Sequence, residues 1–205
     1  ITHGDEKGKP VIEELKTITL LNIDIRGFSL LAKQIGSQKT VSLLNSFFSV
    51  MGGIVFKHHG IVDKYLGDGF LSLFGAPVSS TADADNAISA AIEMKKAMNA
   101  VNRFFQRELG TQVTMGISIH TGEVVVGNIG FEKKMDYTVI GDSVNKVFRL
   151  QDRTKPYPDS ILISEMTSRA ARLPLDLLEL EEPLGGPRIF ELLGIAAAEE
   201  TALAG

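Results

Sequence analysis

The pattern of apolar and polar positions predicts one buried strand and two hairpins in the first two thirds of the chain. A near-continuous apolar run at residues 17–23 is typical of a central strand covered on both faces. Residues 61–74 form two short apolar runs around a Gly-Asp-Gly turn, and glycine supplies the positive φ that a tight hairpin turn requires. Residues 113–119 and 123–129 show a similar pattern around His-Thr-Gly, so a second hairpin is expected there.

Helical periodicity fills most of the sequence between these strands. We expect a short helix at residues 28–34 and a longer one with Ser37 as its cap and Gly60 at its end. A third helix begins near residue 83 with two aspartates in its first turn, as the helix dipole prefers, and runs to about residue 107. The expected apolar stripes are Val41, Leu44, Phe48, Met51 and Val55 on the second helix, and Ala84, Ala87, Ala91, Met94, Met98, Val101 and Phe105 on the third.

This order of elements predicts an α+β domain. It matches a ferredoxin-like βαββαβ core with an extra helix, in which helices cover an antiparallel sheet. The 205 residues are enough for one full-sized domain and hardly for two. We expect a flexible lead-in at residues 1–16, the domain with its C-terminal strands at residues 17–193, and a tail at residues 194–205. Such a platform carries several unrelated activities, so the fold alone does not predict a function.

Composition narrows the classes of partner. The formal net charge is −4, so the basic face that nucleic-acid phosphates demand is not expected. The chain has no cysteine, which excludes disulfides and thiolate chemistry and fits a reducing cytoplasm. No apolar run approaches the roughly 18 residues of a membrane span, so this segment is not expected to contact a membrane. The chain begins with Ile1 rather than Met, which indicates a fragment of a longer regulated or membrane-attached protein whose regulatory domains lie elsewhere.

Two aspartates are placed to meet at one edge of the predicted sheet. Asp24 lies where the apolar strand opens into a loop, and Asp68 is expected at the exposed tip of the first hairpin. If that hairpin pairs with the strand, the carboxylates suit one or two magnesium ions that hold a polyphosphate, because magnesium prefers oxygen ligands and keeps substrate phosphates in its shell. Gly27 would let backbone N–H groups approach those phosphates. The alternative interpretation is an ordinary turn aspartate that bonds its own backbone.

A third segment, residues 135–150, predicts a short strand followed near residue 142 by a helix with a polar cap. Asn145 and Arg149 are four residues apart, so both side chains lie on one face of that helix. An amide and a guanidinium aimed at one point suit a ribose and a transferring phosphoryl group. The alternative is a surface ion pair between Arg149 and Asp152.

The chain resembles the class III nucleotidyl cyclases, the adenylyl and guanylyl cyclase catalytic domain, in four segments: NIDIRGFS at 22–29, VDKYLGDG at 62–69, IHTGEVVVGNIG at 119–130 and DYTVIGDSVNKVFRL at 136–150. The resemblance covers about residues 17–193, and four motifs in the right order are much more specific than any one of them. It implies a homodimer with two equivalent active sites in the groove between the subunits. Each site would be assembled from both chains.

The resemblance also implies which residues one subunit brings to a site. Asp24 and Asp68, with the carbonyl of Ile25, would bind two Mg²⁺ or Mn²⁺ ions that hold the phosphates of ATP. The terminal phosphates would meet backbone amides near three successive residues: Gly27, Phe28 and Ser29.

From the other subunit, Lys64 and Thr138 would read the purine, Asn145 would orient the ribose, and Arg149 would stabilise the transition state at the α-phosphorus. The products would be 3′,5′-cyclic AMP and pyrophosphate. The choice of base has a chemical basis, because a lysine that donates and a hydroxyl that does either serve the ring nitrogen and amino group of adenine. A guanine reader would instead use a carboxylate in the place of Lys64.

Two residues of the family pattern are missing. Gly116 stands where many class III cyclases have a phosphate-contacting arginine, and the phosphate-contacting lysine of the last hairpin has no match, although Arg188 lies in that region. Three alternatives to an adenylyl cyclase therefore stay open. They are a guanylyl cyclase, a diguanylate cyclase or polymerase-like palm, and a weak or inactive cyclase-like module that dimerises or senses nucleotides.

Overall fold

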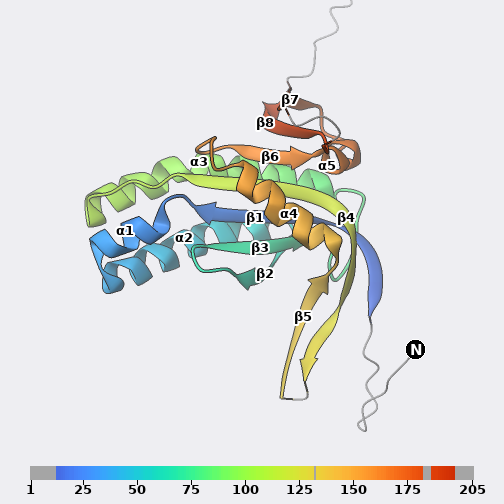
Figure 1. Cartoon of the computed structure of the whole chain (residues 1–205), viewed down its shortest axis with the longest axis horizontal. Helices are drawn as coiled ribbons and strands as arrows, with labels where there is room; N and C mark the ends of the chain where they lie inside the picture. Colours follow the sequence, from blue (N-terminus) through green and yellow to red (C-terminus); the bar gives the residue numbers. More distant parts are fainter. Residues whose placement is uncertain (1–12, 132, 182–185, 197–205) are drawn as a thin grey trace, which may run out of the picture.

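The computed structural model describes residues 13–131, 133–181 and 186–196 (Figure 1). In chain order the elements are β1 (Glu14–Ile25), α1 (Phe28–Ile35), α2 (Ser37–Lys57), β2 (Ile61–Tyr65), β3 (Gly69–Phe74), α3 (Asp83–Leu109), β4 (Met115–Phe131), β5 (Lys134–Ile140), α4 (Asp142–Arg153), β6 (Ile161–Ser164), α5 (Glu165–Ala170), β7 (Leu175–Glu179) and β8 (Ile189–Ile195).

The strands form one mixed sheet in the order β2-β3-β1-β4-β6-β8-β7, with β5 paired to β4 outside this path. The first four strands pair antiparallel in the ferredoxin-like order, with β1 between β3 and β4. β6 continues the sheet parallel to β4, and the β7–β8 hairpin closes that side. The predicted fold class is therefore confirmed.

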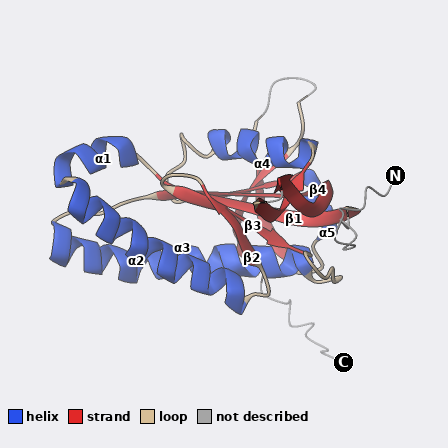
Figure 2. Cartoon of the chain, turned by 90° about the horizontal axis from the view of Figure 1, so that it is seen from below, coloured by secondary structure: helices blue, strands red, loops and turns tan. Residues whose placement is uncertain are grey.

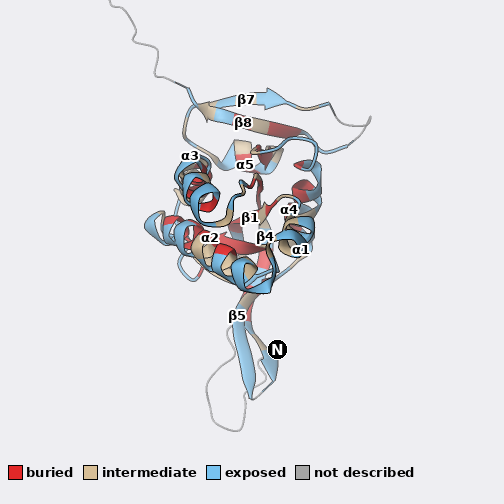
Figure 3. Ribbon diagram, turned by 90° about the vertical axis from the view of Figure 1, so that its left-hand side faces the viewer, coloured by how far each residue is buried: buried red, intermediate tan, exposed pale blue. Residues whose placement is uncertain are grey.

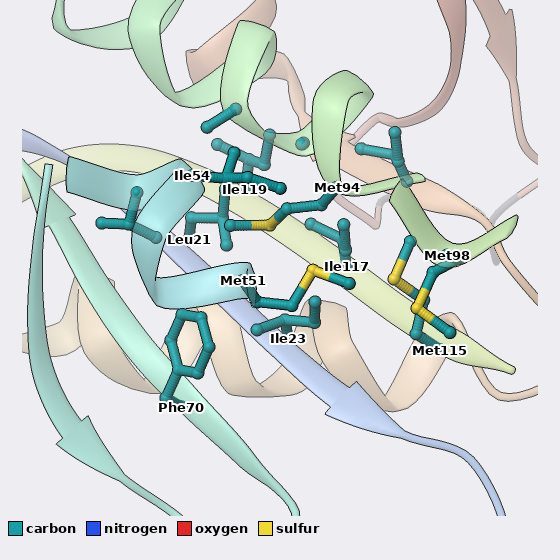
Figure 4. Packing of buried hydrophobic residues seen from close by; sticks show 14 of the residues in the cluster. Leu21, Ile23, Met51, Ile54, Phe70, Met94, Met98, Met115, Ile117 and Ile119 are labelled. Carbon is teal, nitrogen blue, oxygen red and sulfur yellow. The ribbon is translucent and has the colours of Figure 1, made fainter. Parts of the chain in front are cut away.

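Helices cover both faces of the sheet, which explains the unbroken apolar run in β1. α2 and α3 lie on one face and α4 on the other (Figure 2). Leu21 and Ile23 of β1 pack into the cluster beneath α2 and α3, where Met51 and Met94 meet them (Figure 4). Ile18 and Leu20 point to the opposite face and pack with Val147 of α4. Successive side chains of one strand thus fill two cores.

The prediction of a second hairpin is wrong, because one long strand, β4, occupies these residues. It is a single strand of 17 residues, and Thr121 and Gly122 stay extended opposite Thr19 and Ile18 of β1. A Cβ at residue 122 would overlap Oγ of Ser143 and lie 3.2 Å from Cβ of that serine. The glycine therefore admits the first turn of α4 instead of making a turn. Beyond it, β4 and β5 form an arm that projects from the domain (Figure 3).

The apolar stripe of α2 is also corrected. Its core face is made by Leu43, Phe47, Met51, Ile54 and Val55. By contrast, Leu44 and Phe48 are half-buried, and Val41 is 57% exposed. The stripe predicted for α3 is confirmed at every position.

The ends of α2 differ from the predicted caps. Gly36 rather than Ser37 is the N-cap residue, and no side chain caps the first turn. The left-handed residue after the helix is His59, while the N–H of Gly60 donates to the carbonyl of Val55. α2 is long and apolar enough to cross a membrane by length and composition, but its apolar face packs within the domain.

Both predicted ends of the domain shift slightly. β1 begins at Glu14, inside the predicted lead-in, because residues 14–16 pair with residues 124–126 of β4. β8 continues to Ile195, inside the predicted tail, because Ile195 pairs with Leu175. Residues 1–12 and 197–205 lie outside the described residues.

Candidate active site

The two aspartates meet at one edge of the sheet, as expected. Asp24 is the partner of Gly69 in the β1–β3 pairing, and the N–H of Ile25 donates to the carbonyl oxygen of Asp68 at 3.1 Å. A Cβ at residue 69 would overlap the carbonyl oxygen of Ile23, so glycine is needed for the hairpin to close against β1. Asp68 is half-buried in this position rather than fully presented.

The electrostatics of this edge suit a cation. Burial raises the pKa of Asp24, an effect that the neighbouring Arg26 guanidinium opposes, and burial also raises the pKa of Asp68. Oδ1 of Asp24 lies 2.9 Å from Nη1 of Arg26, but the contact lacks hydrogen-bond geometry and Oδ1 has no hydrogen-bond partner among the described residues. A desolvated carboxylate pair is stabilised by positive charge.

The donor set fits magnesium or manganese bound together with a substrate. Among the described residues, no group of three or more His, Cys, Asp or Glu side chains is arranged to hold a metal ion. Two carboxylates with a backbone carbonyl are hard oxygen donors, and magnesium is commonly held by one or two carboxylates plus substrate phosphates. The residues at this edge therefore fit the implied metals, with the nucleotide completing the coordination.

The start of α1 follows closely after Asp24 in the chain. Gly27 has a left-handed conformation, with φ of 65°, and is the N-cap residue of α1. No side chain caps α1 and its first turn contains no acidic residue, so the first amides, including those of Phe28 and Ser29, have no side-chain acceptor. Unsatisfied N–H groups at a helix start suit an anion such as a phosphate.

The predicted base-reading residues lie on two different strands. Lys64 follows a bulge in β2 and makes an ion pair at 3.2 Å with Asp63, whose side chain is fully buried and whose oxygens have no hydrogen-bond partner among the described residues. Thr138 lies on β5, and its Oγ1 is likewise buried without a partner in the described chain. Thr138 therefore has an unpaired hydroxyl within the described part of the chain, while Lys64 is held by Asp63.

Asn145 and Arg149 are exposed on one face of α4. The N-cap residue is Gly141 rather than a polar side chain, which corrects the predicted cap. Ser143 in the first turn instead donates from Oγ to the carbonyl of Glu123 at 2.9 Å and so fixes α4 to β4. The alternative of an Arg149–Asp152 pair is not supported, because Asp152 pairs with Lys155.

A pocket of about 370 Å³ opens beside Arg149, between α4, α5 and β8. Four basic residues line it, together with His120 and Glu165: Lys146, Arg149, Arg153 and Arg188. Arg188 also pairs with Glu179 at 2.7 Å. Neither Asp24 nor Asp68 lines this pocket, so one chain presents the acidic edge and the basic pocket as separate surfaces.

Sequence reasoning missed three of these residues. Lys146 and Arg153 were not predicted as neighbours of Arg149, although spacings of three and four residues place them on the same side of α4. His120 was assigned to a turn. Residues 182–185 of the predicted last hairpin lie outside the described residues, while Arg188, which follows them, lines the pocket.

The fold and these motifs define a nucleotidyl cyclase catalytic domain. Residues 11–181 match the model of the Adenylate and Guanylate cyclase catalytic domain family, so the chain belongs to this family. It is 34% identical over 163 residues to an adenylate cyclase of Anabaena cylindrica, a match that covers 78% of this chain and 32% of that protein. The chain thus spans about a third of the length of this curated relative.

Solved structures of both nucleotide specificities resemble the chain. The guanylyl cyclase Cya2 is 35% identical, with a TM-score of 0.79, 91% of this chain and 96% of that chain covered. The adenylyl cyclase CyaB from P. aeruginosa is 28% identical, with a TM-score of 0.79, 91% and 98% covered. The family is therefore established, while the preferred nucleotide is not decided by similarity.

Proposed function

We propose that this domain is an adenylyl cyclase that converts ATP to 3′,5′-cyclic AMP and pyrophosphate as a homodimer with two shared sites. The observation that carries the proposal is the separation of two complementary surfaces, the acidic edge with Asp24 and Asp68 and the basic pocket with Arg149. A triphosphate held with metal ions needs both. Two copies of the chain, facing each other across a twofold axis, bring one surface of each kind to each site.

Exposed apolar side chains on the arm formed by β4 and β5 support the proposal that a second copy of the chain binds there. Four of them lie along the arm, from its tip at Phe131 to its base at Ile140, and are between 40% and 66% exposed: Phe131, Met135, Tyr137 and Ile140. Exposed apolar side chains on a projecting arm are typical of a protein–protein contact. Since the arm also carries Thr138, its docking on a partner would place the hydroxyl close to the neighbouring site.

In the proposed mechanism Asp24, Asp68 and the carbonyl of Ile25 hold two Mg²⁺ or Mn²⁺ ions. When bound, these ions neutralise the phosphates and lower the pKa of the ribose 3′-hydroxyl. The amides near Gly27 to Ser29 bind the terminal phosphates of ATP.

The partner subunit supplies the remaining groups. Asn145 orients the ribose so that its 3′-oxygen lies in line with the α-phosphorus. Arg149 stabilises the charge that grows on the equatorial oxygens as pyrophosphate leaves, which is the largest contribution expected from a side chain in phosphoryl transfer.

The choice of ATP rests on Lys64 and Thr138. The lysine ammonium can donate to the adenine ring nitrogen, and the threonine hydroxyl can accept from the adenine amino group, whereas guanine presents donors at its ring N–H and 2-amino group. The guanylyl cyclase is the second candidate, because a solved guanylyl cyclase is 35% identical to this chain. A cytoplasmic location belongs to the same proposal, since the substrate is a cytoplasmic nucleotide.

The test is product formation from ATP and from GTP with Mn²⁺ over a range of protein concentrations. We expect cyclic AMP in excess over cyclic GMP, and a specific activity that rises with concentration as dimers form. Cyclic GMP as the main product would assign guanylyl cyclase activity. No product from either nucleotide at any concentration would favour the nucleotide-sensing module instead.

A further inference from the structure

The guanidinium of Arg26 fills the space between Asp24 and Gly116. Its Nη1 lies 2.9 Å from Oδ1 of Asp24 and donates to Oδ2 at 3.3 Å. A Cβ at residue 116 would overlap Nη2 of the same guanidinium and lie 2.6 Å from its Cζ. The same Cβ would overlap Oγ1 of Thr154, so a side chain at residue 116 would have to displace both the Arg26 guanidinium and the Thr154 hydroxyl. The two positions are 90 residues apart in sequence but touch because Asp24 and Gly116 are partners in the β1–β4 pairing.

Most of this guanidinium lacks acceptors. Nε and Nη2 of Arg26 are buried and have no hydrogen-bond partner among the described residues, and the whole side chain is 15% exposed. Leaving the N–H groups of a buried cation without acceptors is unfavourable, so an anion bound beside Arg26 would stabilise the arrangement. Arg26 directly precedes Gly27 and the uncapped start of α1, whose amides also suit an anion.

The contact with Asp24 competes with a metal ion. A divalent cation on the same carboxylate would lie within a few ångströms of the guanidinium, and like charges at such distances repel strongly in a partly buried site. Negative charge from a triphosphate removes that repulsion. Binding of the nucleotide therefore strengthens binding of the metal at this edge, and the reverse. The size of this effect depends on Arg26.

We propose that Arg26 is the internal counter-ion of the metal site. It holds Asp24 when no metal is bound, and it donates to the terminal phosphates when a nucleotide and its metals are bound. This inference rests on the proposed function. It also accounts for Gly116, because the arginine expected on β4 is replaced in space by one from the end of β1.

The test measures Mn²⁺ affinity of the dimeric protein from the electron paramagnetic resonance signal of free Mn²⁺, with and without 3′-deoxy-ATP, which cannot cyclise. For Arg26→Gln we expect Mn²⁺ alone to bind about tenfold more tightly than to the wild type, and 3′-deoxy-ATP to enhance Mn²⁺ binding several-fold less. Arg103→Gln, an exposed arginine on α3, is the matched control and should leave both affinities unchanged.

A second variant tests the space over Gly116 directly. Gly116→Ala keeps Arg26 in the sequence but pushes its guanidinium away, so it should raise Mn²⁺ affinity in the same direction as Arg26→Gln. Unchanged Mn²⁺ affinity in both variants, each folded as judged by circular dichroism, would overturn the proposal. Failure of this proposal can be told apart from failure of the proposed function. If the wild type makes cyclic product and the Mn²⁺ affinity of both variants is unchanged, only the counter-ion role of Arg26 is refuted. A wild type that makes none refutes the proposed function while the Mn²⁺ shift can still be measured.

Discussion

Mixing two inactive variants tests whether each site is shared between subunits. Asp68→Ala removes a carboxylate from the acidic edge, and Arg149→Ala removes the guanidinium from the basic pocket of the same chain. Neither change should unfold the protein. Burial raises the pKa of Asp68, which means that its charged form is unfavourable in the fold, and Arg149 is exposed. Each homodimer of a variant has two defective sites.

The magnitude follows from the proposed geometry. Removing a single group that stabilises the transition state lowers turnover by about 10²- to 10³-fold, so each variant alone should be nearly inactive. After free exchange of equal amounts, about half of the dimers are mixed, and each mixed dimer has one intact site and one site that lacks both groups. The mixture should therefore reach about a quarter of the wild-type activity, far above either parent.

The assay is cyclic AMP formation with Mn²⁺ after the two variants have been incubated together at a concentration that permits exchange. The matched control mixes Asp24→Ala with Asp68→Ala, which damage the same surface, so every dimer keeps two defective sites and no recovery is expected. If the first mixture stays as inactive as its parents although exchange is demonstrated, both surfaces act from one chain. The shared-site proposal is then wrong.

Three further predictions concern single features of the fold and site. Gly122→Ala should destabilise the protein by about 1–3 kcal/mol in denaturant unfolding, because the new methyl group overlaps the hydroxyl of Ser143. Adding Ser143→Ala should recover much of that loss, and no recovery in the double variant would contradict the close-packing explanation. Burial lowers the pKa of His120 from 6.5 to about 4, so the stabilisation from its neutral form is complete above pH 6.5 and is lost as the pH falls toward 4. We expect about 1–2 kcal/mol less stability at pH 5 than at pH 7 after allowing for solvent screening at the pocket, and His120→Gln should flatten that pH dependence. Asp63→Asn should raise the KM for ATP several-fold with little effect on kcat, since Asp63 acts by positioning Lys64, and Lys64→Met should not add to that effect in the double variant.

Local sequence determines the features that were predicted well. The β2–β3 hairpin and the buried face of α3 follow from a turn glycine and from apolar spacing, both of which are read within a few residues. The ferredoxin-like order then follows from the order of the elements, and the meeting of Asp24 with Asp68 follows from that order. A prediction of this kind needs no knowledge of distant contacts.

The errors come from contacts that are distant in sequence. Gly122 looks like a turn residue because glycine is common both in turns and where backbone packs closely against another element, and only the position of Ser143 decides between them. In α2, two adjacent apolar residues recur on successive turns, so the pattern fits a core face containing Phe47 as well as one containing Phe48. Packing of α2 against α3 selects Phe47.

The site residues differ in whether the structure of a single chain shows any sign of their role. Asp24 and Asp68 leave a physical trace in one chain, because burial raises the pKa of both carboxylates, which is a cost to the fold. Asn145 and Arg149 leave none, since an exposed polar residue on a helix is ordinary, and Lys64 shows its role only indirectly, through its ion pair with the buried Asp63. Their roles depend on a second subunit, so their spacing in motifs carries the information. Such residues should tolerate substitution without loss of stability while activity collapses, and that contrast separates residues kept for function from residues kept for the fold.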